Sequence, residues 1–157
     1  EKGGADFLVM PCNSLHIFIE EIRSAVKIPM LSIIKETARF LGEKKVSRVG
    51  ILATSTSLRR KIYESVFEEK NIEQFVPNAD DQAKIGKIIN NIVLKKNDNE
   101  DTDELLKIME KFKKSGIRDV ILACTDLQLL KLHHSDVRIY DTMKIFADAT
   151  VKELLKD

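Results

Sequence analysis

The chain has 157 residues, of which 43% are hydrophobic and 32% are charged, and its 26 basic and 25 acidic side chains leave a net charge of +1. This balance gives no reason to expect nucleic acid or a membrane surface as a partner, and no apolar run reaches the ~18 residues of a membrane span. The chain has two cysteines, which is too few for a disulfide framework, so we expect a cytoplasmic protein with free thiols.

Strand and helix patterns alternate along the chain. We expect strands at 6–10, 29–33, 47–53, 72–76, 119–123 and 137–140. The expected helices lie at 14–26, 34–44, 58–70, 80–95 and 102–115, with one more after Thr125 and a last one from Thr142. A polar linker at 95–101 joins the helices at 80–95 and 102–115. This alternation predicts an α/β fold with a mostly parallel sheet.

The two cysteines lie in similar surroundings. Residues 6–14 read DFLVMPCNS and residues 119–126 read DVILACTD, so each cysteine ends an aliphatic run and precedes two small polar residues that can begin a helix. Ligands of open α/β sheets bind at this edge, and a helix N-terminus there would lower the pKa of a thiol. A single cysteine at such a place is more often a small buried hydrophobe. Two matched ones predict a pair of acid/base groups facing one substrate.

Hydroxyl side chains gather in the loop at 53–57, which reads ATSTS. One hydroxyl is enough to cap the following helix, so the excess predicts a site for a carboxylate. The pairs Asn13-Ser14 and Thr125-Asp126 could cap helices only, or also bind ligand. No cluster of cysteine and histidine has the spacing of a metal site, and we expect His16 to be a spectator.

With these residues in view, the chain resembles the aspartate/glutamate racemase family, and its aspartate racemase branch in particular. The resemblance runs along essentially the whole chain. It rests on Pro11-Cys12-Asn13-Ser14, on Ala-Thr-x-x-Ser in the hydroxyl loop, on Tyr63, and on Ala123-Cys124-Thr125-Asp126.

The resemblance implies a cofactor-independent enzyme of two similar α/β lobes with the substrate between them. Cys12 and Cys124 would be the catalytic thiols, without a metal. The residues implied to bind substrate are Asn13 and Ser14 on one side, Thr54 and Ser57 at a carboxylate, and Thr125 and Asp126 at the amino group. We expect residues 1–46 and 134–157 to form a first, incomplete lobe and residues 47–133 to form the second.

Four departures from the family pattern stand out. Asp126 replaces the usual glutamate, Ser57 replaces threonine, and Thr56 replaces a smaller residue. The opening strand and glycine-rich loop of the family are absent from this chain, so we expect the first lobe to be incomplete here.

The expected function is interconversion of L- and D-aspartate, or glutamate, by two thiols acting on opposite faces of Cα. We expect a small acidic amino acid as ligand and a homodimer as the assembly. Two alternatives stay open: a two-cysteine isomerase or decarboxylase of a non-amino dicarboxylate such as maleate, and a carboxylate-binding relative without catalysis.

Overall fold

The computed structural model describes residues 2–156 and has a four-stranded, all-parallel sheet at its centre. The strands are β1 (Arg48–Ala53), β2 (Glu73–Phe75), β3 (Asp119–Ala123) and β4 (Arg138–Asp141), in the order β2-β1-β3-β4. Ala53 is level with Ala123, and Leu122 is level with Asp141. The carboxyl ends of β1, β3 and β4 therefore meet at one edge. The predicted α/β class is confirmed.

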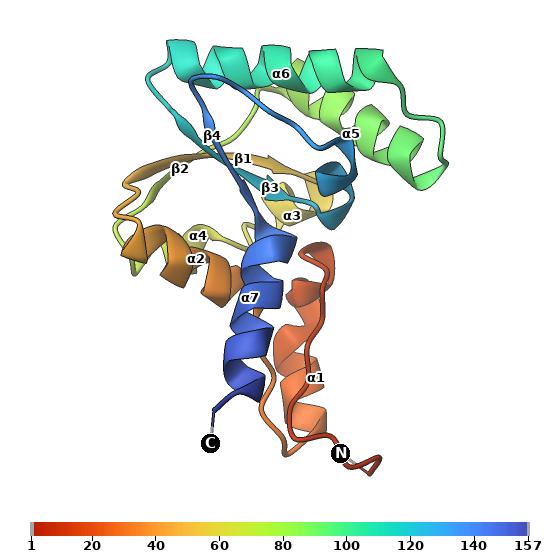
Figure 1. The fold of residues 1–157 in the computed structure, drawn as a ribbon, viewed down its shortest axis with the longest axis vertical. Coiled ribbons are helices and arrows are strands. Elements are labelled where there is room, and N and C mark those ends of the chain that lie inside the picture. Colours follow the sequence, from red (N-terminus) through yellow and green to blue (C-terminus); the bar gives the residue numbers. More distant parts are fainter. Residues whose placement is uncertain (1, 157) are drawn as a thin grey trace.

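Helices cover both faces of this sheet (Figure 1). The α-helices are α1 (Ile19–Ala25), α2 (Ile33–Glu43), α3 (Ser55–Arg59), α4 (Glu64–Glu68), α5 (Ala79–Val93), α6 (Asn99–Lys114) and α7 (Thr142–Leu154). Two 3-10 helices, η1 (Ser14–Phe18) and η2 (Thr125–Leu130), follow the cysteines. Parallel strands buried on both faces are expected to be continuously apolar, as β1 and β3 are after their first residues, Arg48 and Asp119.

Alternate strand residues supply two separate cores. Leu52 and Leu122 pack with the apolar sides of α5 and α6. Ile51 and Ile121 point the other way and pack with α2, α4 and the Phe146 side chain of α7. The sheet thus forms a rigid central layer, and the loops at its carboxyl edge start from fixed backbone positions.

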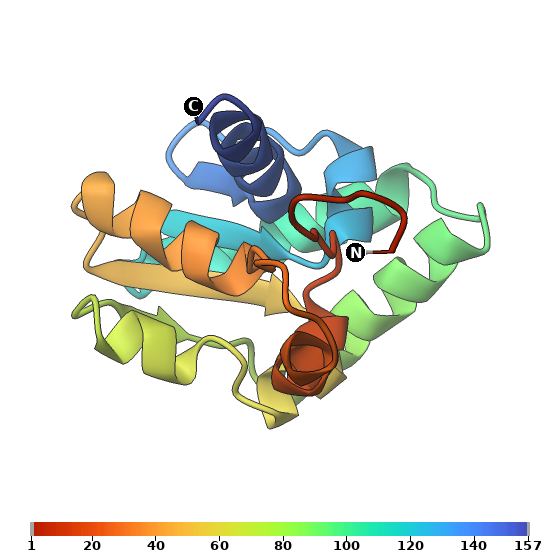
Figure 2. The ribbon, with the colours of Figure 1, turned by 90° about the horizontal axis from the view of Figure 1, so that it is seen from below.

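The N-terminal segment does not contain the predicted strands. Residues 6–10 and 29–33 meet only in the parallel bridge between Leu8 and Met30, where Leu8 N donates to Pro29 O (2.8 Å) and Leu31 N donates to Leu8 O (3.0 Å). Pro29 has no N–H to extend the ladder at one end, and at the other end Ile33 N donates to His16 instead. The chain then continues through η1 and α1, beside α3 (Figure 2), so the helix predicted at 14–26 is divided into two.

The prediction of a single helix at 58–70 is also wrong, because two short helices lie in this part of the chain. Lys61 adopts a left-handed conformation (φ 50°) and separates α3 from α4. α3 begins before the predicted start, because the Thr54 hydroxyl caps it by accepting from Ser57 N. α6 also begins early, at Asn99, because Asp98 and Asp101 form a capping box within the predicted linker.

The division into lobes at residues 46 and 133 stays a prediction. The sheet itself crosses the second of these positions, since β4 pairs with β3. Within residues 2–156, no helix has both the length and the apolar character needed to cross a membrane.

Candidate active site

Three hydroxyl side chains from two distant segments converge at the carboxyl edge of the sheet. Thr54 follows β1 directly, and its Oγ1 lies 3.0 Å from Ser57 Oγ on α3. Ser14, at the start of η1, brings its Oγ within 3.0 Å of Thr54 Oγ1 and 3.3 Å of Ser57 Oγ. We call Ser14, Thr54 and Ser57 the hydroxyl cluster. It joins residues that the sequence placed in two separate loops, and Ser57 within it is 2% exposed.

Asn13 is held by protein groups at both ends of its amide. Tyr63 OH donates to Asn13 Oδ1, and Asn13 Nδ2 donates to Thr142 Oγ1 at 3.1 Å. Thr142 in turn donates to the carbonyl of Leu122 in β3 at 2.7 Å. All three side chains are buried, and burial raises the pKa of Tyr63 above its ordinary value, so this phenol stays protonated and donates. Asn13 Nδ2 carries a second N–H, and its one hydrogen bond to a side chain of the described residues is the bond to Thr142.

The sequence did not indicate Thr142 as part of this network. The sequence marks Thr142 only as the start of the last helix, which Asp141 caps by accepting from Met143 N and Lys144 N. The sequence indicated Tyr63 only through the resemblance to the racemase family. The separation of 129 residues between Asn13 and Thr142 leaves no local signal for their contact.

Cys124 follows β3 and is 7% exposed. Its Sγ donates to Asp126 Oδ2 at 3.5 Å. Burial is the main cause that raises the pKa of Cys124 to about 12; the Asp126 carboxylate and Cys12 raise it further, while the Asp126 backbone N–H lowers it. The expectation that a helix N-terminus lowers this pKa is wrong for Cys124, because desolvation outweighs a helix as short as η2. The thiol is therefore protonated at neutral pH.

The two cysteines are both free, and Cys12 is half-buried. Cys12 is near enough for its charge to contribute to the raised pKa of Cys124. The parallel register places Thr54 and Cys124 side by side, each one residue beyond its strand. Ser14 and Asn13 then hold the segment of Cys12 against Thr54 and Thr142. That both sulfurs open onto one cleft stays a prediction.

His16 is buried, 5% exposed, in contrast to the expectation of a spectator. Its Nδ1 lies 2.7 Å from the carbonyl oxygen of Cys12, and its Nε2 accepts from Ile33 N at 3.2 Å. Burial is the largest cause that lowers the pKa of His16; Arg23 lowers it further, and the hydrogen bond to Cys12 acts against both. The ring thus connects the backbone of one cysteine to the start of α2.

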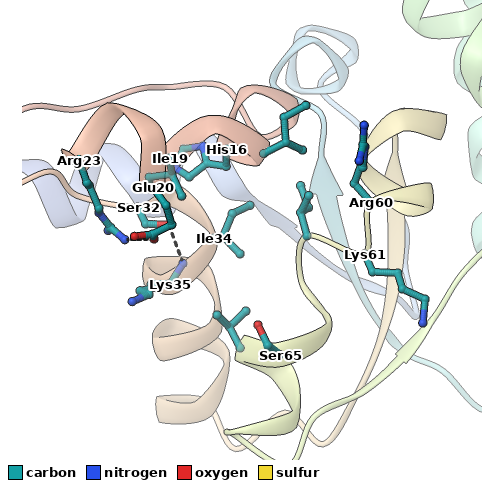
Figure 3. A pocket seen from close by; sticks show the side chains of 13 residues that line it. His16, Ile19, Glu20, Arg23, Ser32, Ile34, Lys35, Arg60, Lys61 and Ser65 are labelled. Atoms are coloured by element: carbon teal, nitrogen blue, oxygen red, sulfur yellow. Dashed lines mark hydrogen bonds and ion pairs between the residues drawn. The ribbon is translucent and has the colours of Figure 1, made fainter. Parts of the chain in front are cut away.

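A pocket with a volume of about 360 Å³ lies between η1, α1, α2 and the α3–α4 linker (Figure 3). Ile34 lies among its lining residues with His16, while the charged ends of Arg60 and Lys61 extend away from its middle. None of the eight predicted site residues lines it. Among residues 2–156, no group of three or more histidine, cysteine, aspartate or glutamate side chains is placed to hold a metal ion.

Comparison with known proteins places this chain among racemases. A family described as Asp/Glu/hydantoin racemase matches residues 1–150. The broad specificity amino-acid racemase RacX of Bacillus subtilis (strain 168) is 30% identical over 156 residues, which are 99% of this chain and 67% of that protein.

Solved structures give the same result. The crystal structure of an aspartate racemase homologue from Pyrococcus horikoshii OT3 is 26% identical, with a TM-score of 0.85 over 99% of this chain and 69% of that one. The Picrophilus torridus aspartate racemase, at 22% identity, shares the fold, with a TM-score of 0.83 over 98% of this chain and 64% of that one. The chain spans about two thirds of the length of these relatives. The resemblance inferred from the cysteine motifs is confirmed, and the chain belongs to the Asp/Glu/hydantoin racemase family.

Proposed function

We propose that this protein is a cofactor-independent racemase of an acidic amino acid, aspartate or glutamate, and that Cys12 and Cys124 are its two acid/base groups. The observation that carries the proposal is the convergence at one sheet edge. The hydroxyl cluster brings the segment of Cys12 to the end of β1, next to Cys124 at the end of β3. Membership of a racemase family supports the reaction class.

The proposed chemistry follows from what racemisation requires of two acid/base groups. Racemisation requires removal of the α-proton from one face of Cα and delivery of a proton to the other. Thiolate at Cys12 takes the α-proton as the Cα–H bond breaks, and the protonated thiol of Cys124 gives its proton to the opposite face. In the reverse direction, Cys124 is the base and Cys12 the acid, so the pair always holds one proton.

Charge develops on the substrate carboxylate as the α-proton leaves. The hydroxyl cluster and the second N–H of Asn13 are hydrogen-bond donors held in place before substrate arrives, which is the arrangement that stabilises such charge best. Asp126 Oδ2 lies 3.5 Å from Cys124 Sγ, and its carboxylate is our candidate for binding the substrate ammonium. Thr125, half-buried beside it, completes this side of the site.

The test is exchange at Cα in heavy water. L- and D-aspartate and L- and D-glutamate are incubated with the protein, and deuterium incorporation and enantiomer ratio are followed by NMR and chiral chromatography. We expect both enantiomers of one substrate to exchange and interconvert. Exchange-free isomerisation of maleate would instead favour the non-amino dicarboxylate alternative, and binding without any turnover would favour the inactive relative.

The variants Cys12→Ser and Cys124→Ser separate the two thiols. Because a serine hydroxyl is a much weaker acid, each variant loses racemisation by about 10²–10⁴-fold. Each should still exchange the α-proton of one enantiomer, and the favoured enantiomer should differ between them. Full racemisation by either variant would disprove the two-base assignment. The expected homodimer is tested separately by light scattering.

A further inference from the structure

The hydrogen bonds of His16 determine its tautomer. Nε2 accepts from the backbone N–H of Ile33, so this nitrogen carries no proton. The proton of the neutral ring therefore lies on Nδ1, which donates to the carbonyl oxygen of Cys12 at 2.7 Å. Both polar atoms of the ring are used, and only 5% of the residue is exposed.

The far end of this connection is rigid. Ile33 is the first residue of α2, and its N–H is one of the groups that a helix leaves without an intrahelical partner. His16 supplies that partner, while Ser32 caps the same turn by accepting from Lys35 N. The side chain of Ile33 is fully buried in the core beside β1. Through the two hydrogen bonds of His16, the backbone at Cys12 is therefore fixed relative to the buried start of α2.

We propose that His16, in its neutral Nδ1–H form, is the positioning residue of Cys12: it holds the main chain at this cysteine and so sets the direction of its thiol. The proposal rests on the proposed function, in which Cys12 is one of the two bases. Cys12 lies between two fixed points, the carbonyl held by His16 and the following side chain, Asn13, held by Tyr63 and Thr142.

Acid should break the other bond of the ring, the one that His16 Nε2 accepts from Ile33 N. A proton added at Nε2 removes the acceptor of Ile33 N–H and places a positive charge at the N-terminus of α2, where the helix dipole opposes it. The other charged groups lining the pocket next to His16 are mostly basic: Glu20 and Arg23 on α1, Lys35 on α2, and Arg60 and Lys61 of the α3–α4 linker. Burial also lowers the pKa of His16, so the ring stays neutral at pH 7.

Two conservative variants divide the functions of the ring. The amide of asparagine reaches the place of Nδ1, so His16→Asn can keep the bond to Cys12 but cannot reach Ile33. The amide of glutamine reaches the place of Nε2, so His16→Gln can keep the bond to Ile33 and loses the bond to Cys12. The exposed His133 provides the matched control, His133→Gln.

We expect His16→Gln to lower kcat about tenfold with KM changed less than about twofold, since it misplaces a reacting group without touching substrate contacts. His16→Asn should keep kcat within about threefold and unfold at a lower temperature, because the first N–H of α2 loses its partner. The control should match the wild type in kcat and in thermal unfolding. The wild type should lose thermal stability as the pH falls and His16 is protonated, and His16→Gln, which has no titrating ring at this position, should lack this component.

A second readout does not require turnover. In a Cys124→Ser background, the alkylation rate of Cys12 by iodoacetamide reports on its exposure and thiolate character. We expect this rate to change at least about threefold in His16→Gln and to stay near the wild-type rate in His16→Asn. If the protein racemises nothing, the proposed function fails, yet this comparison still decides the role of His16. Unchanged kcat and alkylation in His16→Gln, or equal losses in both variants that follow the unfolded fraction, would overturn the proposal.

Discussion

Removing the Tyr63 hydroxyl should destabilise the fold through Asn13. Tyr63→Phe keeps the ring, which packs against Phe67 with centroids 5.0 Å apart, and deletes the hydroxyl that donates to Asn13 Oδ1 and also interacts with Thr37. No cavity of any size is made. The change therefore removes one buried hydroxyl at the edge of the candidate active site.

The expected loss follows from the burial of both partners. Tyr63 and Asn13 are each 2% exposed, so water cannot replace the lost donor. A buried acceptor left without a partner costs about 1–3 kcal/mol. In a domain of this size, 1 kcal/mol corresponds to about 2–4 °C in the melting temperature, so a mid-range loss of about 2 kcal/mol predicts a decrease of about 4–8 °C. Because Asn13 follows Cys12, kcat should fall as well.

The measurement is urea and thermal unfolding followed by circular dichroism, with kcat measured on the same samples. Tyr140→Phe is the control: its hydroxyl donates to Asp119 Oδ1 at 2.9 Å, but Asp119 keeps two hydrogen bonds from Arg138, at 2.7 and 2.6 Å. The control should lose less than about 1 kcal/mol of unfolding free energy. If Tyr63→Phe is as stable as the control, the bond to Asn13 does not contribute as argued.

Two further predictions concern Cys124 and the glycines. Burial raises the pKa of Cys124 to about 12. In the direction in which Cys124 is the acid, loss of its proton should therefore cause no decline of kcat/KM below about pH 11, and Asp126→Asn should move this decline to lower pH. A decline from this thiol near the ordinary range of about pH 8–9 would contradict the prediction. Above that range the unfolded chain releases the thiol proton and the folded chain does not, so stability should fall as pH rises. Gly50→Ala should destabilise by about 1–3 kcal/mol, because an added Cβ would lie 2.9 Å from the Phe112 ring, whereas Gly86→Ala, with open space in α5, should stabilise by about 0.5–1 kcal/mol in urea titrations.

The elements that the sequence predicted well are those determined by local pattern. β1 and β3 are continuous aliphatic runs, and α5 and α6 have one apolar face, so period and composition identified them to within a few residues. The same patterns failed at Lys61, which interrupts a helix in a left-handed conformation without a glycine or asparagine to mark it. They failed also at residues 6–10, because an aliphatic run becomes a strand only where a neighbour offers a full ladder.

In the candidate site too, local sequence predicted some features and only the tertiary structure decided others. The sequence alone identified both cysteines and the hydroxyls at strand ends, because parallel strands place such residues at one edge. Tertiary structure decided that Ser14 contacts Thr54, 40 residues away, and that His16 is a buried link rather than a spectator. Tertiary structure also changed the direction of the expected pKa shift of Cys124 from lowered to raised. The sequence motif shows only that a helix follows the cysteine, whereas desolvation depends on every group packed around the sulfur. Burial is a property of the assembled fold, and no local run of residues encodes it.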